Sequence, residues 1–164
     1  MEPWHFMLLA EHLIANCCSP DPHPRGSGAK AAELRTAISR CYYATFLTSR
    51  ELLNELGYKV TETGACHAIV RRAMIESRDP HLARAASSYA TLGEYRRKAD
   101  YDMEDADGES LEYAQDMLRQ CKNAYTQLIT ALQRIRQDEA HLSVLVSAID
   151  AWVARDGEKQ IWKG

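Results

Sequence analysis

Residues 111–135 read LEYAQDMLRQCKNAYTQLITALQRI, the most regular stretch of the chain. Its apolar residues recur in steps of three and four, which is the spacing of one helical face. They are Leu111, Ala114, Leu118, Cys121, Tyr125, Leu128, Leu132 and Ile135. A seam sustained over this length indicates helices that cross at a shallow angle, as in a helical bundle. Ser110 precedes the seam and is expected to cap this helix.

The rest of the chain supplies further helices, and none of it shows the pattern of a strand. We expect helices over residues 3–17, 29–56 and 65–77, another that starts at about residue 82, and a last one over about 139–154. Breaks rich in proline, glycine or acidic residues separate them. The prediction is an all-α, up-and-down four-helix bundle with an additional short helix and a C-terminal helical extension. It forms one domain over residues 1–164, with its core at about 3–137, its extension at about 138–164 and Trp162 in a frayed tail.

Composition is that of an ordinary soluble domain, with 46% hydrophobic and 26% charged residues. The net charge of −3 gives no overall basicity that would indicate a nucleic-acid partner. Its distribution is uneven, because residues 59–98 hold eight basic side chains against four acids, whereas residues 100–116 hold eight acids and no base. The basic segment can therefore present a local positive surface.

The cysteines and the N-terminal segment predict a cytoplasmic protein. The five cysteines are odd in number and lack C-x-x-C spacing, which favours free thiols in a reducing compartment. Glu2, Glu11 and His12 interrupt the apolar start, so it resembles neither an export signal nor a membrane span. His5 and His12 lack further metal ligands, and the acidic turn fails the EF-hand pattern, so we expect no metal and no cofactor.

Residues 96–102 read RRKADYD and carry the most distinctive chemistry. A helical stripe through Leu82, Ala85, Tyr89 and Leu92 continues to Arg96 and Ala99. A guanidinium on such a stripe is costly unless it is paired, and Asp100, four residues on, lies on the same face. Two interpretations stay open at this point. The pair either fixes how helices pack, or belongs to a cleft that binds or cleaves phosphate esters.

Three segments together resemble the HEPN family. Residues 39–46 (SRCYYATF) are similar to its S-R-x-Y-Y-A-x-F run, and residues 96–102 to its R-x-x-A-D-Y signature. Between them, residues 63–67 (TGACH) resemble the entry to that family's short helix. The resemblance covers about residues 5–135. It implies an all-α bundle that forms homodimers.

The resemblance also implies a function. Many members are metal-independent RNases of toxin–antitoxin or phage-defence systems, often encoded beside a nucleotidyltransferase. Their active site is an arginine followed by a histidine, shared across the dimer interface. Arg96 matches the arginine, but Asp100 stands at the histidine position. A carboxylate is a weaker proton carrier near neutral pH than imidazole, and Tyr101 is no ready substitute. RNA binding is therefore expected more than strong cleavage.

The expected site combines a possible catalytic set with a phosphate-binding set. The catalytic set is Arg96, Asp100 and Tyr101, and the RNA- or phosphate-binding set is Arg40, Tyr43, Arg97 and His67. Two parts of this set have a structural alternative: Arg40 can be an arginine stem lying on the Tyr43 ring, and His67 can be a histidine beside a helix start. The alternative functions are a non-catalytic dimeric module that binds a nucleotidyltransferase or an effector, and a nucleotide-sensing domain.

Overall fold

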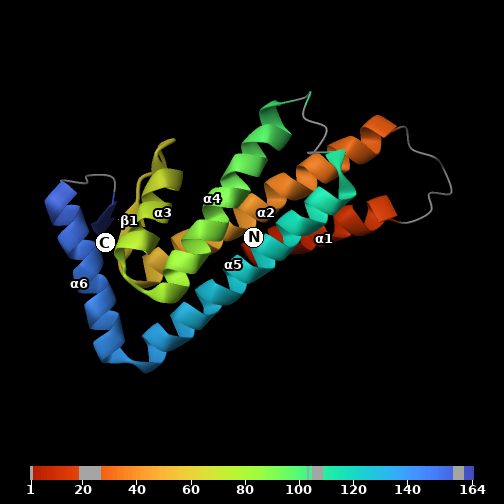
Figure 1. Cartoon of the computed structure of the whole chain (residues 1–164). Helices are drawn as coiled ribbons and strands as arrows, with labels where there is room; N and C mark the ends of the chain where they lie inside the picture. The colour runs from red at the N-terminus through yellow and green to blue at the C-terminus, as the bar shows by residue number, and fades with distance from the viewer. Residues whose placement is uncertain (1, 19–26, 103, 105–108, 157–160) are drawn as a thin grey trace. The chain divides into compact units, whose positions relative to one another are not determined.

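The fold is an all-α helical bundle, as the sequence predicts (Figure 1). The computed structural model describes residues 2–18, 27–102, 104, 109–156 and 161–164. Within them lie six helices and two short strands. The elements are α1 (Trp4–Cys18), α2 (Ser27–Glu55), β1 (Tyr58–Val60), α3 (Cys66–Glu76), α4 (Pro80–Tyr101), α5 (Leu111–Gln137), α6 (Glu139–Asp156) and β2 (Ile161–Lys163). Most of the acidic turn and of the segment 19–28 falls outside the described residues.

The chain forms two compact units. Unit 1 comprises Met1–Thr45 and Ser88–Asn123, and unit 2 comprises Phe46–Ser87 and Ala124–Gly164. The helices α2, α4 and α5 each contribute one part to unit 1 and the other to unit 2. The single domain expected from the sequence stays a prediction.

The buried face of α5 is centred slightly to one side of the expected stripe. Its buried positions are Ala114, Met117, Cys121, Ala124, Leu128, Ala131 and Ile135. These keep the three-and-four spacing, whereas Leu111, Leu118, Tyr125 and Leu132 are only partly buried. The expected stripe followed mostly large apolar residues, whereas Ala114, Ala124 and Ala131 lie on the face that is buried. The cap is confirmed, because the Tyr113 backbone N–H donates to Ser110 Oγ at 3.4 Å.

In unit 1 a tyrosine pair joins α2 to α4. The rings of Tyr42 and Tyr89 are stacked with centroids 5.2 Å apart, and their hydroxyl oxygens lie 2.9 Å apart. Gly93 lies against this pair, since a Cβ placed there would be 3.3 Å from Tyr42 Cε2. The glycine therefore makes room for a ring that the stacking holds in place.

The helix α1 buries less than its composition suggests. A broad apolar arc is expected to pack on two neighbours, yet only Ala10 and Ile14 of this helix are buried. Trp4, Leu8 and Leu9 are 40–43% exposed. The helix does contact two neighbours, since Glu11 pairs with Lys122 of α5 at 2.6 Å and Phe6 lies under the Arg40 guanidinium of α2, but no described part of the chain covers Trp4, Leu8 and Leu9.

In unit 2 two strands appear where the sequence suggested a break and a frayed tail. The strands β1 and β2 pair antiparallel, with Tyr58 opposite Lys163, Lys59 opposite Trp162 and Val60 opposite Ile161. Three residues are too few for an alternating pattern, so sequence reasoning missed both strands. Gly57, with a φ of 87°, turns the chain out of α2 in the left-handed conformation that the sequence predicts for this helix end.

A buried aspartate fixes the start of α4 in unit 2. Asp79 Oδ1 accepts hydrogen bonds from the backbone N–H groups of His81 and Leu82 at 2.8 and 2.9 Å. Its Oδ2 lies 2.9 Å from His141 Nε2 and 3.6 Å from Arg134 Nη1, and its side chain has no exposed surface. The carboxylate therefore serves as an N-cap and also ties α4 to α5 and α6.

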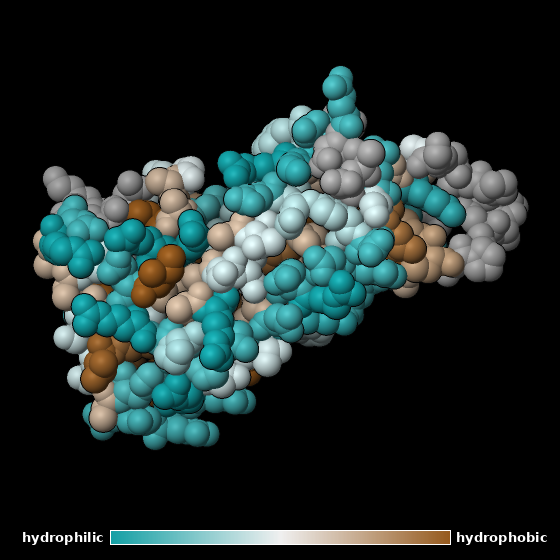
Figure 2. All heavy atoms as spheres, in the orientation of Figure 1, coloured by the Kyte–Doolittle hydropathy of each residue, from teal (hydrophilic) through white to brown (hydrophobic). Residues whose placement is uncertain are grey.

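None of the helices within the described residues is long and apolar enough to cross a membrane. On the face shown in Figure 2, hydrophilic side chains predominate and the hydrophobic ones form separate patches. Scattered apolar patches of this kind are usual on protein surfaces in contact with water.

Candidate functional site

The last turns of α4 turn Arg96 towards α2 in unit 1. Its Nε lies 2.6 Å from Asp100 Oδ2, and the two side chains are only 22% and 25% exposed. Its Nη2 donates to the Tyr43 hydroxyl at 3.2 Å. The Nε–H itself makes no hydrogen bond, so the contact with the carboxylate is an ion pair of close charges. The pairing expected from the four-residue spacing is confirmed.

Three tyrosine rings surround the Arg96 guanidinium. Its central carbon lies 5.2 Å from the ring centre of Tyr101, 5.6 Å from that of Tyr43 and 6.0 Å from that of Tyr42. Burial alone would lower the pKa of Arg96, but Asp100, then Tyr43 and Tyr101, outweigh it and raise the pKa. The group is therefore a permanent cation held by one carboxylate and by aromatic faces.

Arg40 shares Tyr43 with Arg96. The Arg40 guanidinium carbon lies 5.5 Å from the Tyr43 ring centre and 5.6 Å from that of Phe6. Its Nε is buried without a hydrogen-bond partner, and no described residue forms an ion pair with it. Two guanidinium groups thus lie against one phenol ring, and among the described residues Asp100 is the carboxylate that pairs with one of them. This leaves a local excess of positive charge in unit 1.

A groove of about 550 Å³ opens beside this cluster, between the first half of α2 and the end of α4. Among the side chains that line it are Arg35, Ser39, Arg40, Asp100 and Glu109. Ser39 Oγ donates to Asp100 Oδ2 across a long 3.5 Å contact. The Asp100 carboxylate is therefore held between Arg96 and Ser39, at the wall of the groove.

Arg35 is the residue of this region that sequence reasoning missed. Its Nη1 donates to the backbone oxygens of Asp102 at 2.8 Å, Ala99 at 3.1 Å and Lys98 at 3.4 Å. Its Nε and Nη2 both reach Glu109 Oε1 at 3.2 Å. The guanidinium therefore caps the C-terminus of α4, the turn that carries Asp100 and Tyr101. The sequence offers one indication that Arg35 is buried: it lies next to Leu34 and three residues before Ile38, near the apolar face of its helix.

The remaining expected residues differ in their surroundings. Tyr101 is 72% exposed although its ring lies against Arg96, and Arg97 is exposed on the same turn of α4. His67 belongs to unit 2, where its ring packs on Phe46 with centroids 4.1 Å apart. Unit 1 therefore brings together Arg40, Tyr43, Arg96, Asp100 and Tyr101, and the assignment of His67 to the same site stays a prediction.

The chemistry of this cluster is that of charge and stacking. It contains guanidinium, phenol, hydroxyl and carboxylate groups. In the part of the chain that the structure describes, no group of three or more His, Cys, Asp or Glu side chains could hold a metal ion. The cluster can therefore stabilise the negative charge of a phosphate and offer an aromatic face to a base.

The cysteines do not contribute to the groove. All five are free, and Cys41, Cys66 and Cys121 are buried. The hydrogen bond with Cys121, together with burial, raises the pKa of the Cys41 thiol well above its usual value. Cys41 is therefore an unreactive core residue, as its position on an apolar helix face suggests.

Comparison with protein-family models, with curated proteins and with solved structures finds no match for this chain. The resemblance to the HEPN family therefore rests on its motif residues alone.

Proposed function

We propose that the chain is a HEPN-type RNA-associated protein of a toxin–antitoxin or phage-defence system, with the Arg40–Arg96 cluster as its RNA phosphate site. The observation that carries the proposal is that both guanidinium groups lie against the Tyr43 ring beside the groove. Arginine binds phosphate through two parallel N–H donors and keeps its charge at any physiological pH. A phosphate in the groove would balance the excess positive charge.

Single-stranded RNA is the favoured form of the ligand. Tyr101 presents an exposed ring next to Arg96, and an unpaired base can stack on such a ring. Arg97 and Lys98 are exposed on the same helix end and can contact further phosphates of the same strand. A double helix would keep its bases stacked on each other, so it would gain less from Tyr101.

Cleavage by this cluster is expected to be weak or absent. Metal-independent RNA cleavage needs a group that removes the 2′-hydroxyl proton and another that protonates the leaving oxygen. The titratable groups beside Arg96 are Asp100, which is engaged in the ion pair, and the phenols of the neighbouring tyrosines, which are protonated near neutral pH in general. We therefore propose that the cluster binds RNA. Any metal-independent endoribonuclease activity would be weak, because Asp100 stands at the position where the active site needs a histidine.

Binding of a fluorescent single-stranded RNA, measured by anisotropy at several salt concentrations, tests this proposal. Arg96→Gln is expected to weaken binding about tenfold and to reduce the salt slope by about 0.7, the value for one phosphate contact on a single strand. Arg119→Gln is the matched control, because Arg119 lies in the same unit, 69% exposed and paired with Asp116 at 2.7 Å. Incubation of both variants with tRNA and total RNA shows whether any cleavage depends on Arg96. Equal affinities of Arg96→Gln and wild type would remove this site from consideration.

A second candidate is a non-catalytic interaction module. The observation that favours it is the exposed apolar face of α1, formed by Trp4, Leu8 and Leu9. A second copy of the chain, a nucleotidyltransferase or another effector could cover this face. Under this alternative Leu8→Glu reduces the dimer fraction in analytical ultracentrifugation, and Arg96→Gln leaves RNA binding unchanged. A chain that stays monomeric and binds RNA through Arg96 would contradict it.

A further inference from the structure

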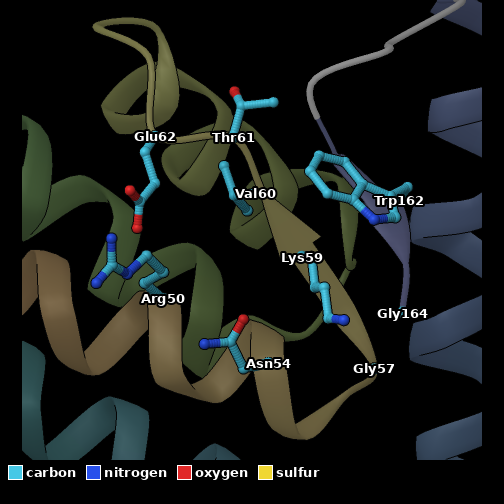
Figure 3. A pocket seen from close by; sticks show the side chains of 9 residues that line it. All are labelled: Arg50, Asn54, Gly57, Lys59, Val60, Thr61, Glu62, Trp162 and Gly164. Atoms are coloured by element: carbon cyan, nitrogen blue, oxygen red, sulfur yellow. The ribbon is translucent and has the colours of Figure 1, made fainter.

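Unit 2 holds a pocket whose lining mixes both signs of charge. It lies beside the β1–β2 ribbon, has a volume of about 580 Å³, and Arg50, Lys59 and Glu62 are among the residues that line it (Figure 3). Such a lining selects no ligand by charge. A more definite chemistry lies in the core of unit 1, where two cysteines meet.

The thiols of Cys41 and Cys121 form a buried pair between α2 and α5. They hydrogen-bond to each other, and the two residues are 0% and 1% exposed. Thr45 Oγ1 lies 3.7 Å from Cys121 Sγ and adds a hydroxyl to the contact. The two cysteines are about eighty residues apart in the sequence, so a bond between their sulfurs would close a loop that contains the first segment of unit 2. Because the sulfurs are already in contact, such a bond needs little movement of the backbone.

The two thiols differ in acidity. The hydrogen bond with Cys41 lowers the pKa of the Cys121 thiol against the effect of burial, and the contact with Thr45 lowers it further. The same hydrogen bond, together with burial, raises the pKa of Cys41. Cys121 is therefore the better nucleophile, and Cys41 is a protonated thiol in contact with it. A nucleophilic cysteine beside a second thiol is the arrangement of a redox-sensitive pair.

The thiol pair lies close to the surface of unit 1. Lys122 follows Cys121 in the chain and pairs with Glu11 at 2.6 Å, and these two side chains are 51% and 34% exposed. The charges of Glu11 and Lys122 act on both thiols, so the ion pair is near them. Brief local openings at this partly exposed position admit a small uncharged oxidant and exclude a bulky reagent.

We propose that Cys41 and Cys121 form a redox switch, in which a peroxide converts the two thiols into a disulfide that links α2 to α5. The Cys121 thiolate attacks one oxygen of hydrogen peroxide, which gives a sulfenic acid and, with the thiol proton, one water. The Cys41 sulfur then attacks the Cys121 sulfur, and the Cys41 proton leaves with the hydroxyl group as a second water. Cys41 is unreactive towards dissolved reagents but reacts within the pair, because the sulfenic acid forms in contact with it. The switch does not depend on the function proposed for the Arg40–Arg96 cluster.

Mass spectrometry of the full chain tests the proposal. N-ethylmaleimide first blocks the accessible thiols, among them the exposed Cys18, and hydrogen peroxide is then added. Wild type is expected to lose about 2 Da, the mass of two hydrogens, and to regain it with dithiothreitol. Trypsin cleaves after arginine and lysine, so the disulfide should join peptide 41–50 to peptide 120–122.

Four variants and a melting experiment sharpen the test. Cys41→Ala and Cys121→Ala should each abolish the cross-link, whereas Cys66→Ala is the matched control, because Cys66 is a buried thiol of unit 2. Thr45→Val should slow the oxidation on the order of threefold, since Cys121 loses a hydrogen-bond partner. Oxidised wild type should melt about 5–10 °C above the reduced protein, because the disulfide closes a long loop. Thermal melts of the reduced variants show that each keeps the fold.

The outcomes of these measurements are distinct. The joined peptides in wild type, their absence from Cys41→Ala and Cys121→Ala, and the rise in melting temperature support the proposal. Peroxide treatment that leaves both thiols free in folded wild type would overturn it. The same holds for oxidation of Cys121 to a sulfinic acid without the cross-link, for a cross-link to another cysteine, and for an oxidised form that melts below the reduced one.

Discussion

Replacing Arg35 by methionine should destabilise the protein and weaken its candidate RNA site together. Methionine keeps an unbranched, flexible apolar stem but removes the guanidinium and every donor. The Arg35 side chain is 7% exposed and supplies hydrogen bonds to three backbone oxygens at the end of α4 and to Glu109. Hydrogen bonds from a charged donor contribute about 1.5–3 kcal/mol each, but water can replace part of them at a helix end. We therefore expect a loss of about 3 kcal/mol.

For a chain of this length such a loss lowers the melting temperature by about 6–12 °C. Differential scanning calorimetry measures it, with Arg119→Met as the control, because an exposed ion pair contributes at most about 1 kcal/mol. RNA anisotropy on the same samples should show weaker binding, since Asp100 and Tyr101 lie on the turn that Arg35 caps. A melting temperature of Arg35→Met equal to that of the control would refute the assignment of Arg35 as the cap of α4.

Three further changes test other parts of the fold. Asp79→Ala should lower the free energy of unfolding by about 2–3 kcal/mol in urea titrations, and Asp79→Asn, which keeps the N-cap, should lower it by about half as much. Equal stability of wild type and both variants would contradict the role of this carboxylate. Alanine favours a helix by about 1 kcal/mol relative to glycine, but Gly93→Ala should give no gain in melting temperature, because the stacked Tyr42 ring cannot move away from the added Cβ. A clear gain would show that the ring can move. Burial and then the hydrogen bond to Asp150 raise the pKa of Tyr58, so the free energy of unfolding that this phenol contributes is present below about pH 10 and is lost as the pH rises above it. In urea titrations, Tyr58→Phe should therefore lose less stability than wild type above about pH 10. Parallel pH profiles of the two proteins would contradict this role of Tyr58.

The long helices could be predicted from the sequence because their apolar residues repeat over many turns. The pattern placed α5 at 111–135, two residues short of the observed Leu111–Gln137. The β1–β2 ribbon could not be predicted, since each strand has three residues and its partner lies about a hundred residues away. The exposed side of α1 was missed for another reason. An apolar residue shows what it can bury, but not whether a neighbour is present.

The candidate site was predictable where its contacts are local. The four-residue spacing within one helix brings Arg96 to Asp100, and the ion pair follows. The approach of Tyr43 and Arg40 joins α2 to α4, and only the motif resemblance anticipated it. Arg35 could not be recognised, because its partners, three backbone oxygens and Glu109, lie more than sixty residues away and no local spacing links them to it.

The ion pair of Arg96 has a consequence for ligand selection. Asp100 is an internal competitor, because a carboxylate anchored one helical turn away acts at an effective concentration far above that of dissolved anions. A chloride, sulfate or single phosphate ion in the surrounding buffer is thus at a disadvantage at this guanidinium. A ligand that makes several contacts at once can displace the carboxylate, since the other contacts offset the loss of the pair. Such a site discriminates by valency, favouring polyanions over lone ions without reading any base.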